Sequence, residues 1–288
     1  MQNATETFLL LTFKNQFIYT MRYCLFLSLI LVSLCTKASV DTVAIYSVSM
    51  KKNIKTVVIT PASYNKDKHY PTVYLLHGYS DTYNGWIRKV PEIEKMSEIY
   101  QVIIVCPDGG FSSWYIDSPI DSTYRYETFV STEVPIFIDI HYNTIPDRKA
   151  RAITGLSMGG HGGMFLGFRH ADTFGACGSM SGGVDLNYSR NKFDVAKRIG
   201  DTINHADNWI NFSVIHTVEN YPKQGLAIIF DCGVDDFFYN DNLALHNKML
   251  ALKIKHDYIE RPGKHEWSYW ANAIQYQLLF FRNYFDRK

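Results

Sequence analysis

Short apolar runs alternate with helix-like stretches along most of this chain of 288 residues. Two of the runs, 102–105 (Val-Ile-Ile-Val) and 227–230 (Ala-Ile-Ile-Phe), are apolar without a break. Strands of a parallel sheet are buried on both faces and have this pattern, whereas half-exposed strands alternate apolar and polar residues. The pattern therefore predicts an α/β fold with a mostly parallel central sheet and helices on both faces.

The same reading assigns each element to a range of residues. The expected strands are 43–48, 55–60, 71–76, 101–106, 150–155, 175–180, 226–232 and 256–261, and the expected helices are 91–98, 125–140, 158–169, 240–252 and 266–284. The segment 184–224 is more polar and irregular, and we expect it to cap one end of the sheet. Because no repeat or Pro/Ser-rich linker divides residues 39–288, we expect them to form one domain.

The first 38 residues are predicted to be an export segment outside that domain. A basic start at 21–23 (Met-Arg-Tyr) precedes an apolar run at 24–35 and a small-residue end, which is the pattern of a secretory signal peptide over 21–38. The apolar run is shorter than the ~20 residues that a membrane span needs. We therefore expect export to the periplasm or the extracellular space, and no membrane span once the signal is removed.

Two alternatives concern this N-terminal segment. Cys35 could carry a lipid anchor, although Leu34 before it is bulkier than the residue usual in lipoprotein signals. Translation could begin at Met1 or at Met21. Removal of residues 1–38 from the 288 leaves 250 residues, enough for one large α/β domain.

Charge and cysteine content exclude several classes of protein. The 29 basic and 28 acidic residues nearly cancel, so there is no general electrostatic reason to expect nucleic-acid binding. Beyond the export segment, Cys106, Cys177 and Cys232 are odd in number and have no CxxC spacing, so buried thiols are expected, with at most one disulfide. His265-Glu266 lacks the second histidine of a zinc-protease motif, and no metal or organic cofactor is expected.

The strongest chemical signal is the segment 155–160, Gly-Leu-Ser-Met-Gly-Gly, between an expected strand and an expected helix. G-x-S-x-G in that context forms a tight, strained turn that projects the serine side chain. The helix that follows directs its N-terminal amides toward developing negative charge. Ser157 is therefore the candidate nucleophile.

A serine nucleophile needs a base, and the base needs a carboxylate that orients it. In α/β-hydrolases the acid and then the histidine follow the serine along the chain. Here Asp235 and Asp236 follow the expected strand 226–232, and His265 lies in a Pro/Gly-rich turn after the next strand. Nothing in the residues themselves separates Asp235 from Asp236. His161 is close to Ser157 in sequence but faces away from it if the helix is continuous.

A second glycine turn follows the expected strand 71–76, at His77-Gly78-Tyr79. Hydrolases of this kind stabilise an oxyanion with one backbone amide after the nucleophile and a second from the loop after an early strand. The amides of Met158 and Tyr79 are the candidates.

Taken together, these motifs resemble a known family of enzymes. His77-Gly78 and the G-L-S-M-G-G turn resemble those of the esterase D-like ("putative esterase") α/β-hydrolases, as do the segments 84–86 (N-G-W), 114–119 (W-Y-I-D-S-P), 236–237 (D-F) and 262–270 (P-G-K-H-E-W-S-Y-W). The family includes feruloyl and acetylxylan esterases, S-formylglutathione hydrolases and mycolyltransferases, and the resemblance extends over about residues 45–285.

The resemblance implies an α/β-hydrolase fold and a role for each candidate residue. Ser157 would be the nucleophile, His265 the base and Asp236 its partner, with Tyr79 and Met158 as oxyanion donors. S-formylglutathione hydrolases usually have Thr-Cys after the His-Gly pair, where this chain has Tyr79-Ser80-Asp81. With the export signal, this departure favours the exported carbohydrate esterases over a cytosolic thioesterase.

The expected function is thus a secreted serine carboxylesterase acting on acetyl or feruloyl groups of a plant polysaccharide. The alternatives are a mycolyltransferase-like acyltransferase, an S-formylglutathione hydrolase-like thioesterase and an inactive carbohydrate-binding relative. Aromatic residues make up 15% of the chain, and flat aromatic faces suit sugar rings or phenolic acids. Trp86, Trp114, Tyr115 and Trp267 are the candidate substrate-binding residues, whereas Trp270 is expected in the core.

Overall fold

The computed structural model describes residues 38–287, and the expected export segment, including Cys35, lies outside the described residues apart from Ala38. Eight strands form one sheet in the order β1-β2-β4-β3-β5-β6-β7-β8. The strands are β1 (Ser39–Ser47), β2 (Lys52–Thr60), β3 (Thr72–Leu76), β4 (Ile103–Pro107), β5 (Arg151–Gly155), β6 (Ala176–Met180), β7 (Ala227–Gly233) and β8 (Asp257–Arg261). All eight expected strands are present, and the first begins four residues earlier than expected.

Only the first strands depart from a parallel arrangement. β1 pairs antiparallel with β2, β2 pairs antiparallel with β4, and every later pairing is parallel. Most strands are buried along their whole length, which explains their unbroken apolar sequences. β1, at the edge of the sheet, is mostly exposed and is the strand with the least regular apolar pattern.

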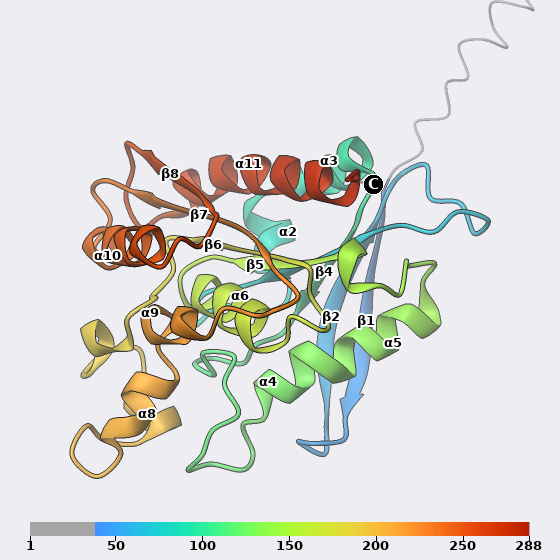
Figure 1. Cartoon of the computed structure of the whole chain (residues 1–288). Helices are drawn as coiled ribbons and strands as arrows, with labels where there is room; N and C mark the ends of the chain where they lie inside the picture. Colours follow the sequence, from blue (N-terminus) through green and yellow to red (C-terminus); the bar gives the residue numbers. More distant parts are fainter. Residues whose placement is uncertain (1–37, 288) are drawn as a thin grey trace, which may run out of the picture. The chain divides into compact units, whose positions relative to one another are not determined.

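Helices cover both faces of this sheet (Figure 1). One face packs against α2 (Gly85–Lys89), α3 (Ile93–Tyr100) and α11 (Trp267–Phe285). The other packs against α4 (Tyr126–Thr128), a π-helical turn (Phe129–Glu133), α5 (Val134–His141), α6 (Met158–Arg169), α9 (Val214–Thr217) and α10 (Tyr239–Ala251). The expected α/β fold with helices on both faces is confirmed. Helix α2 was not expected, because a five-residue helix is too short to show a periodic pattern.

The segment 184–224 contains only short helices, as its irregular sequence indicates. It includes α7 (Val195–Ile199), α8 (Ala206–Asn211), α9 and two 3₁₀ turns, Leu186–Ser189 and Val218–Asn220. A further 3₁₀ turn, Arg148–Ala150, directly precedes β5. Apolar residues of this segment, such as Trp209 and Val214, are buried in the same core as α6. The segment is therefore packed onto the domain rather than extended from it.

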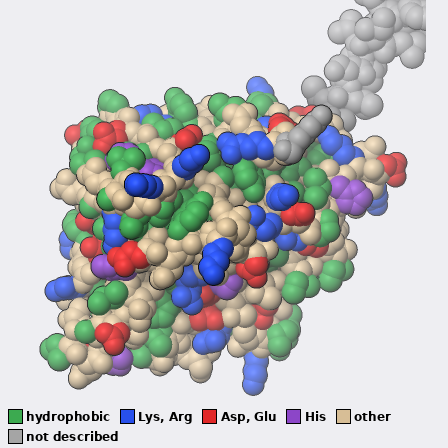
Figure 2. Space-filling model, viewed as in Figure 1, with side chains coloured by type: hydrophobic (Ala, Val, Ile, Leu, Met, Phe, Trp, Pro, Cys, Tyr) green, Lys and Arg blue, Asp and Glu red, His purple; other side chains and the backbone are tan. Residues whose placement is uncertain are grey.

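Three further features of the described residues bear on function. None of the helices within residues 38–287 is long and apolar enough to cross a membrane. Cys106, Cys177 and Cys232 are free and buried, and burial raises the pKa of each thiol well above its usual value. Figure 2 shows basic and acidic side chains interspersed on the face in view, with no large area of one sign.

The glycines of helix α6 let its backbone approach the backbone of the sheet. A Cβ at Gly163 would lie 2.4 Å from the Gly178 carbonyl oxygen of β6 and 2.9 Å from the Thr154 Cα of β5. Both contacts are with backbone, which cannot move without disturbing the sheet. The helix axis is thus held at a distance that only glycine permits.

We expect Gly163→Ala to lower the free energy of unfolding by about 1–3 kcal/mol, the usual cost of overpacking a core. The loss should occur even though alanine favours helices by ~1 kcal/mol over glycine. Urea unfolding measures the change. Asn272→Ala, on the exposed side of α11, is the control and should stay within about 0.5 kcal/mol of the unmodified protein. An unchanged Gly163→Ala variant would contradict the close approach.

Candidate active site

Ser157 lies between β5 and the first residue of α6, at the carboxyl end of the parallel strands. Its backbone is at φ 55° and ψ −116°, a conformation that non-glycine residues rarely adopt. A Cβ at Gly155 or at Gly159 would lie 2.6 Å from the Leu76 carbonyl oxygen, so both positions require glycine. The turn therefore has the strained geometry that G-x-S-x-G predicts, and it leaves the Ser157 side chain half-buried.

Three side chains from three separate turns meet at this point. The His265 ring, after β8, places Nε2 2.8 Å from Ser157 Oγ. Its Nδ1 lies 2.8 Å from Oδ2 of Asp236, which follows β7. Because an ionised carboxylate only accepts, Nδ1 donates to Asp236, and Nε2 is left to accept the serine proton. The arrangement can activate a serine hydroxyl for attack on a carbonyl carbon.

The structure brings Asp236, and not Asp235, to the histidine. The Asp236 side chain is fully buried, and its second oxygen, Oδ1, accepts the Phe238 backbone N–H at 2.8 Å. The Asp235 side chain is exposed, while its backbone N–H donates to the Gly263 carbonyl in the turn before His265. Neighbouring residues in this turn point in opposite directions, which the sequence could not reveal.

Aromatic rings restrict the His265 imidazole on several sides. The Phe237 ring centre lies 4.2 Å from that of His265. Trp270 meets the imidazole edge-on at 4.9 Å and is buried, as expected for a core residue. Only 15% of the His265 side chain is exposed. The imidazole is therefore held in one orientation by packing as well as by hydrogen bonds.

The loop after β3 lies against the serine turn. A Cβ at Gly78 would lie 2.6 Å from the Leu156 side chain and 3.5 Å from Ser157 Cβ. The next amide, that of Tyr79, and the first amide of α6, that of Met158, donate to no protein acceptor within residues 38–287. Free backbone amides beside a serine hydroxyl can bind the oxyanion of a tetrahedral intermediate.

Two of the expected substrate-binding tryptophans pack against each other at α2 and α11. Trp86 is fully buried and donates from Nε1 to the Leu76 carbonyl oxygen at 3.1 Å. Trp267 is half-buried and meets Trp86 edge-on at 5.2 Å. The expectation for Trp86 is wrong, because its ring fills the core beneath the loop and offers no face to a ligand. Trp267 keeps an exposed part.

Trp114 and Tyr115 are also buried, so the expectation that they contact substrate is wrong for both. Their backbones have positive φ angles of 55° and 57°. This turn directs both rings inward, where Trp114 Nε1 donates to the Phe193 carbonyl and the Tyr115 hydroxyl donates to the His77 carbonyl. Both buried side chains therefore hold neighbouring loops of the site in place, through hydrogen bonds to the Phe193 and His77 carbonyls. Large aromatic rings favour burial, and spacing in sequence does not show which way they turn.

Other aromatic side chains, exposed or half-buried, lie beside the site, and the sequence did not predict that any of them binds substrate. Phe237 is 43% exposed although its ring contacts His265, and it stacks with Phe193 and Tyr188 at ring-centre distances of 6.2 and 6.0 Å. Tyr79 lies edge-on to Phe193 and to Phe111, and completes the group. We call these five residues the aromatic cluster. In the sequence, only Tyr79 and Phe237 lie next to motif residues. Tyr188 and Phe193 come from the irregular segment 184–224, which has no motif.

The other histidine near the serine, His161, faces away from it as expected. Its Nδ1 and Nε2 lie 3.0 and 2.8 Å from the carbonyl oxygens of Trp114 and Phe212. Burial lowers its pKa to about 4, against the opposing effect of these carbonyls. Among residues 38–287, no three histidine, cysteine or carboxylate side chains are grouped in a way that could hold a metal ion.

Comparison with known proteins places this chain in a family. An acetyl esterase of Caldicellulosiruptor saccharolyticus is 29% identical over 260 residues, which cover 80% of this chain and 95% of that protein. The diacylglycerol acyltransferase/mycolyltransferase Ag85B of Mycobacterium avium is 34% identical over 142 residues, 46% of this chain and 42% of that one. A solved ferulic acid esterase has 29% identity and a TM-score of 0.75, covering 87% of this chain and 99% of the other.

The model of the family described as "Putative esterase" matches residues 47–281, most of the described chain. The resemblance seen in the sequence motifs is thus confirmed over nearly the length expected. The chain belongs to this esterase family of α/β-hydrolases and is an enzyme that hydrolyses ester bonds.

Proposed function

We propose that this protein is an exported serine carboxylesterase whose catalytic triad is Ser157, His265 and Asp236. The observation that carries the proposal is the continuous chain of two 2.8 Å hydrogen bonds from Ser157 Oγ through the imidazole to the buried Asp236 carboxylate. The order of the three residues along the chain and their place after β5, β7 and β8 support the same assignment.

In this mechanism the Ser157 oxygen bonds to the ester carbonyl carbon while its proton moves to His265 Nε2. The carbonyl π pair moves onto oxygen, and the Tyr79 and Met158 amides stabilise the resulting oxyanion. As that pair returns, the bond to the alcohol oxygen breaks, and the alcohol leaves with the proton from Nε2. Water then bonds to the acyl carbon while one of its protons moves to Nε2. The bond from that carbon to Ser157 Oγ breaks, Oγ takes the proton from Nε2, and the acid leaves.

For the substrate, we propose an acetyl or feruloyl ester of a plant polysaccharide. The aromatic cluster supports an aromatic acyl group, since Phe237 offers an exposed ring beside His265. The near-zero net charge suits a neutral ester better than a polyanion. The names of the acetyl esterase and ferulic acid esterase relatives are consistent with these two acyl groups. The signal-like segment 21–38 supports export.

An acyltransferase is the second candidate, because of the identity to the mycobacterial acyltransferase over 142 residues. The same acyl-enzyme would then pass its acyl group to a sugar hydroxyl in place of water. Product analysis with excess alcohol acceptor separates the two. Free acid as the main product supports the hydrolase, and transferred ester as the main product supports the transferase.

We expect Ser157→Ala to lower kcat on p-nitrophenyl acetate by roughly 10⁶-fold, as loss of a triad serine does. The variant should also fail to react with a fluorophosphonate probe, because it has no nucleophilic oxygen. Thermal unfolding near that of the unmodified protein would show that the fold is intact. Full activity in this variant would disprove the assignment of the nucleophile.

Two neighbouring aspartates form a matched pair for testing the acid. Asp236→Asn should lower kcat by about 10⁴-fold, because an amide that donates to Nδ1 holds the imidazole in the wrong tautomer. Asp235→Asn removes the same charge one residue away, on an exposed side chain, and should leave kcat nearly unchanged. Steady-state kinetics of the pair measures this. Equal losses in the two variants would indicate a general charge effect in place of the proposed contact.

The aromatic cluster is tested by a change in acyl preference. Phe237→Ala should lower the ratio of kcat/KM for methyl ferulate to that for methyl acetate by about threefold to tenfold, the value of one aromatic contact. Both esters release methanol, so any effect on His265 cancels in the ratio. Ile140→Ala, an exposed apolar residue of α5, is the control. A constant ratio would reject the feruloyl part of the proposal.

A further inference from the structure

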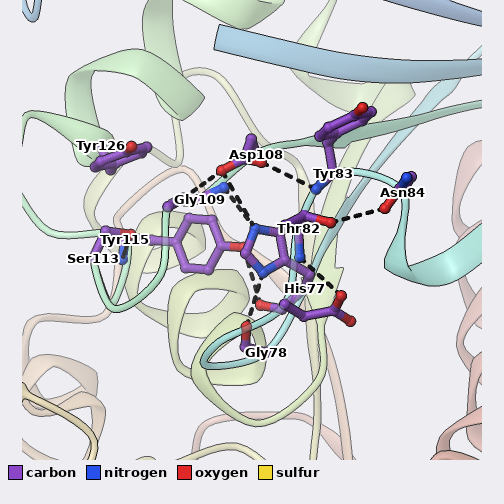
Figure 3. Close-up of polar contacts among 12 residues, drawn as sticks. His77, Gly78, Thr82, Tyr83, Asn84, Asp108, Gly109, Ser113, Tyr115 and Tyr126 are labelled. Atoms are coloured by element: carbon purple, nitrogen blue, oxygen red, sulfur yellow. Dashed lines mark hydrogen bonds and ion pairs between the residues drawn. The ribbon is translucent and has the colours of Figure 1, made fainter.

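The mechanism above gives no role to His77, although its imidazole is buried at the end of β3, next to the oxyanion loop (Figure 3). The Gly109 backbone nitrogen lies 2.7 Å from its Nε2, and the Gly78 carbonyl oxygen lies 2.8 Å from its Nδ1. Each ring nitrogen thus has one backbone partner. One partner is a donor and the other is an acceptor.

These partners determine where the imidazole carries its proton. A backbone N–H can only donate, so Nε2 must present its lone pair to Gly109, and Nδ1–H donates to the Gly78 carbonyl. Burial lowers the pKa of His77, which favours this neutral form, although nearby Asp108 and Asp81 raise it. Asp108 Oδ1, 4.0 Å from Nε2, already accepts the Gly110 N–H at 2.7 Å.

The hydrogen bond from His77 to the Gly78 carbonyl also affects the direction of the Tyr79 N–H, because the two groups share one planar peptide unit. The Gly78 carbonyl and the Tyr79 N–H belong to one peptide unit, and no described peptide bond is cis. In a trans peptide the C=O and N–H point in opposite directions, so a hydrogen bond that holds the oxygen also sets the direction of the N–H. A donor to the carbonyl also polarises the amide and strengthens the N–H as a donor.

We propose that His77 is a positioning residue that aims and polarises the Tyr79 amide toward the oxyanion, through the sequence Gly109 N–H to Nε2, then Nδ1–H to the Gly78 carbonyl. The inference rests on the proposed role of Tyr79 in the oxyanion site. It assigns to His77 an effect on the transition state and none on substrate binding.

The surrounding contacts hold this sequence of bonds in place. The Tyr115 hydroxyl donates to the His77 carbonyl at 3.0 Å, which fixes the peptide before Gly78. The Ser80 N–H donates to the Phe111 carbonyl at 2.8 Å, which fixes the peptide after Tyr79. A Cβ at Gly109 would lie 2.4 Å from the Tyr115 ring, so only glycine lets this amide reach His77. The peptides on both sides are fixed by protein groups, and the Tyr79 N–H is left free.

Two substitutions separate the two bonds of His77. In His77→Asn, the amide nitrogen occupies the place of Nδ1 and can still donate to Gly78, while the Gly109 bond is lost. In His77→Gln, the amide oxygen occupies the place of Nε2 and can still accept from Gly109, while the Gly78 bond is lost. We expect His77→Gln to lower kcat tenfold to a hundredfold with little change in KM, and His77→Asn to stay within about threefold, since complete loss of an oxyanion donor costs ~10²–10³.

A transition-state analogue gives a second readout. A trifluoromethyl ketone that adds to Ser157 forms an oxyanion, so its inhibition constant should rise in His77→Gln by the same factor as kcat/KM falls. Thermal unfolding is measured on both variants. If His77 had only a structural role, the loss of kcat in each variant would follow its loss of thermal stability. It would not depend on whether the Gly78 or the Gly109 hydrogen bond is kept. Equal kcat in the two variants, or a greater loss in His77→Asn, would overturn the proposal.

The unmodified protein provides a test that needs no variant to fold. Nuclear magnetic resonance of ¹⁵N-labelled protein identifies His77 by a coupling across the hydrogen bond from Gly109 nitrogen to Nε2, and the ring shifts then show which nitrogen is protonated. Protonated Nδ1 and bare Nε2 support the proposal, and the reverse tautomer overturns it. Activity retained in Ser157→Ala would instead refute the proposed function, so the two failures are distinguishable.

Discussion

The site depends on the strained backbone of Ser157, which would relax without the strands on both sides of it. Non-glycine residues in sparsely populated backbone regions cost about 1–3 kcal/mol each and persist only where the surroundings hold them. Here the Ser157 N–H donates to the Met180 carbonyl of β6, and the Leu156 N–H donates to the Leu76 carbonyl of β3. The parallel sheet thus supplies hydrogen bonds from its neighbouring strands that offset the strain. The Ser157 side chain is thus positioned by backbone contacts, independently of its hydrogen bond to His265.

A buried polar network gives similar support to β7 and β8, the two strands that precede Asp236 and His265. Asp231 of β7 is fully buried and pairs with Arg261 of β8 at 3.1 Å and with Gln277 of α11 at 2.9 Å. Burial raises the pKa of Asp231 to about 6, while Arg261 acts in the opposite direction. Asp231 precedes Asp236 by five residues, and Arg261 precedes His265 by four. The network therefore links the ends of β7 and β8, and the turns that follow these ends carry Asp236 and His265 to Ser157.

Aromatic residues serve two separate purposes around the site. Trp86, Trp114 and Tyr115 are buried and donate hydrogen bonds to backbone carbonyls at the end of β3 and in neighbouring loops. Phe237 and its stacked neighbours lie on the exposed side of His265. The first group keeps the loops in position, and the second is available to a substrate. Tyr115 belongs to the first group, and its hydroxyl donates to the His77 carbonyl, in the same loop as the Tyr79 amide.

The sequence by itself determined the fold class, all eight strands and the Ser-Asp-His order, because unbroken apolar runs and glycine turns are local signals with a direct physical cause. The residues themselves did not separate Asp235 from Asp236, for which only the family resemblance implied Asp236, and the sequence placed three buried aromatics at the substrate. Side-chain direction at a turn depends on backbone angles, such as the positive φ of Trp114 and Tyr115, that no residue spacing reveals. Only the tertiary structure decided which aspartate meets His265, which rings stay exposed, and that His77 lies between Gly109 and Gly78. Each of these facts depends on contacts between segments far apart in the chain.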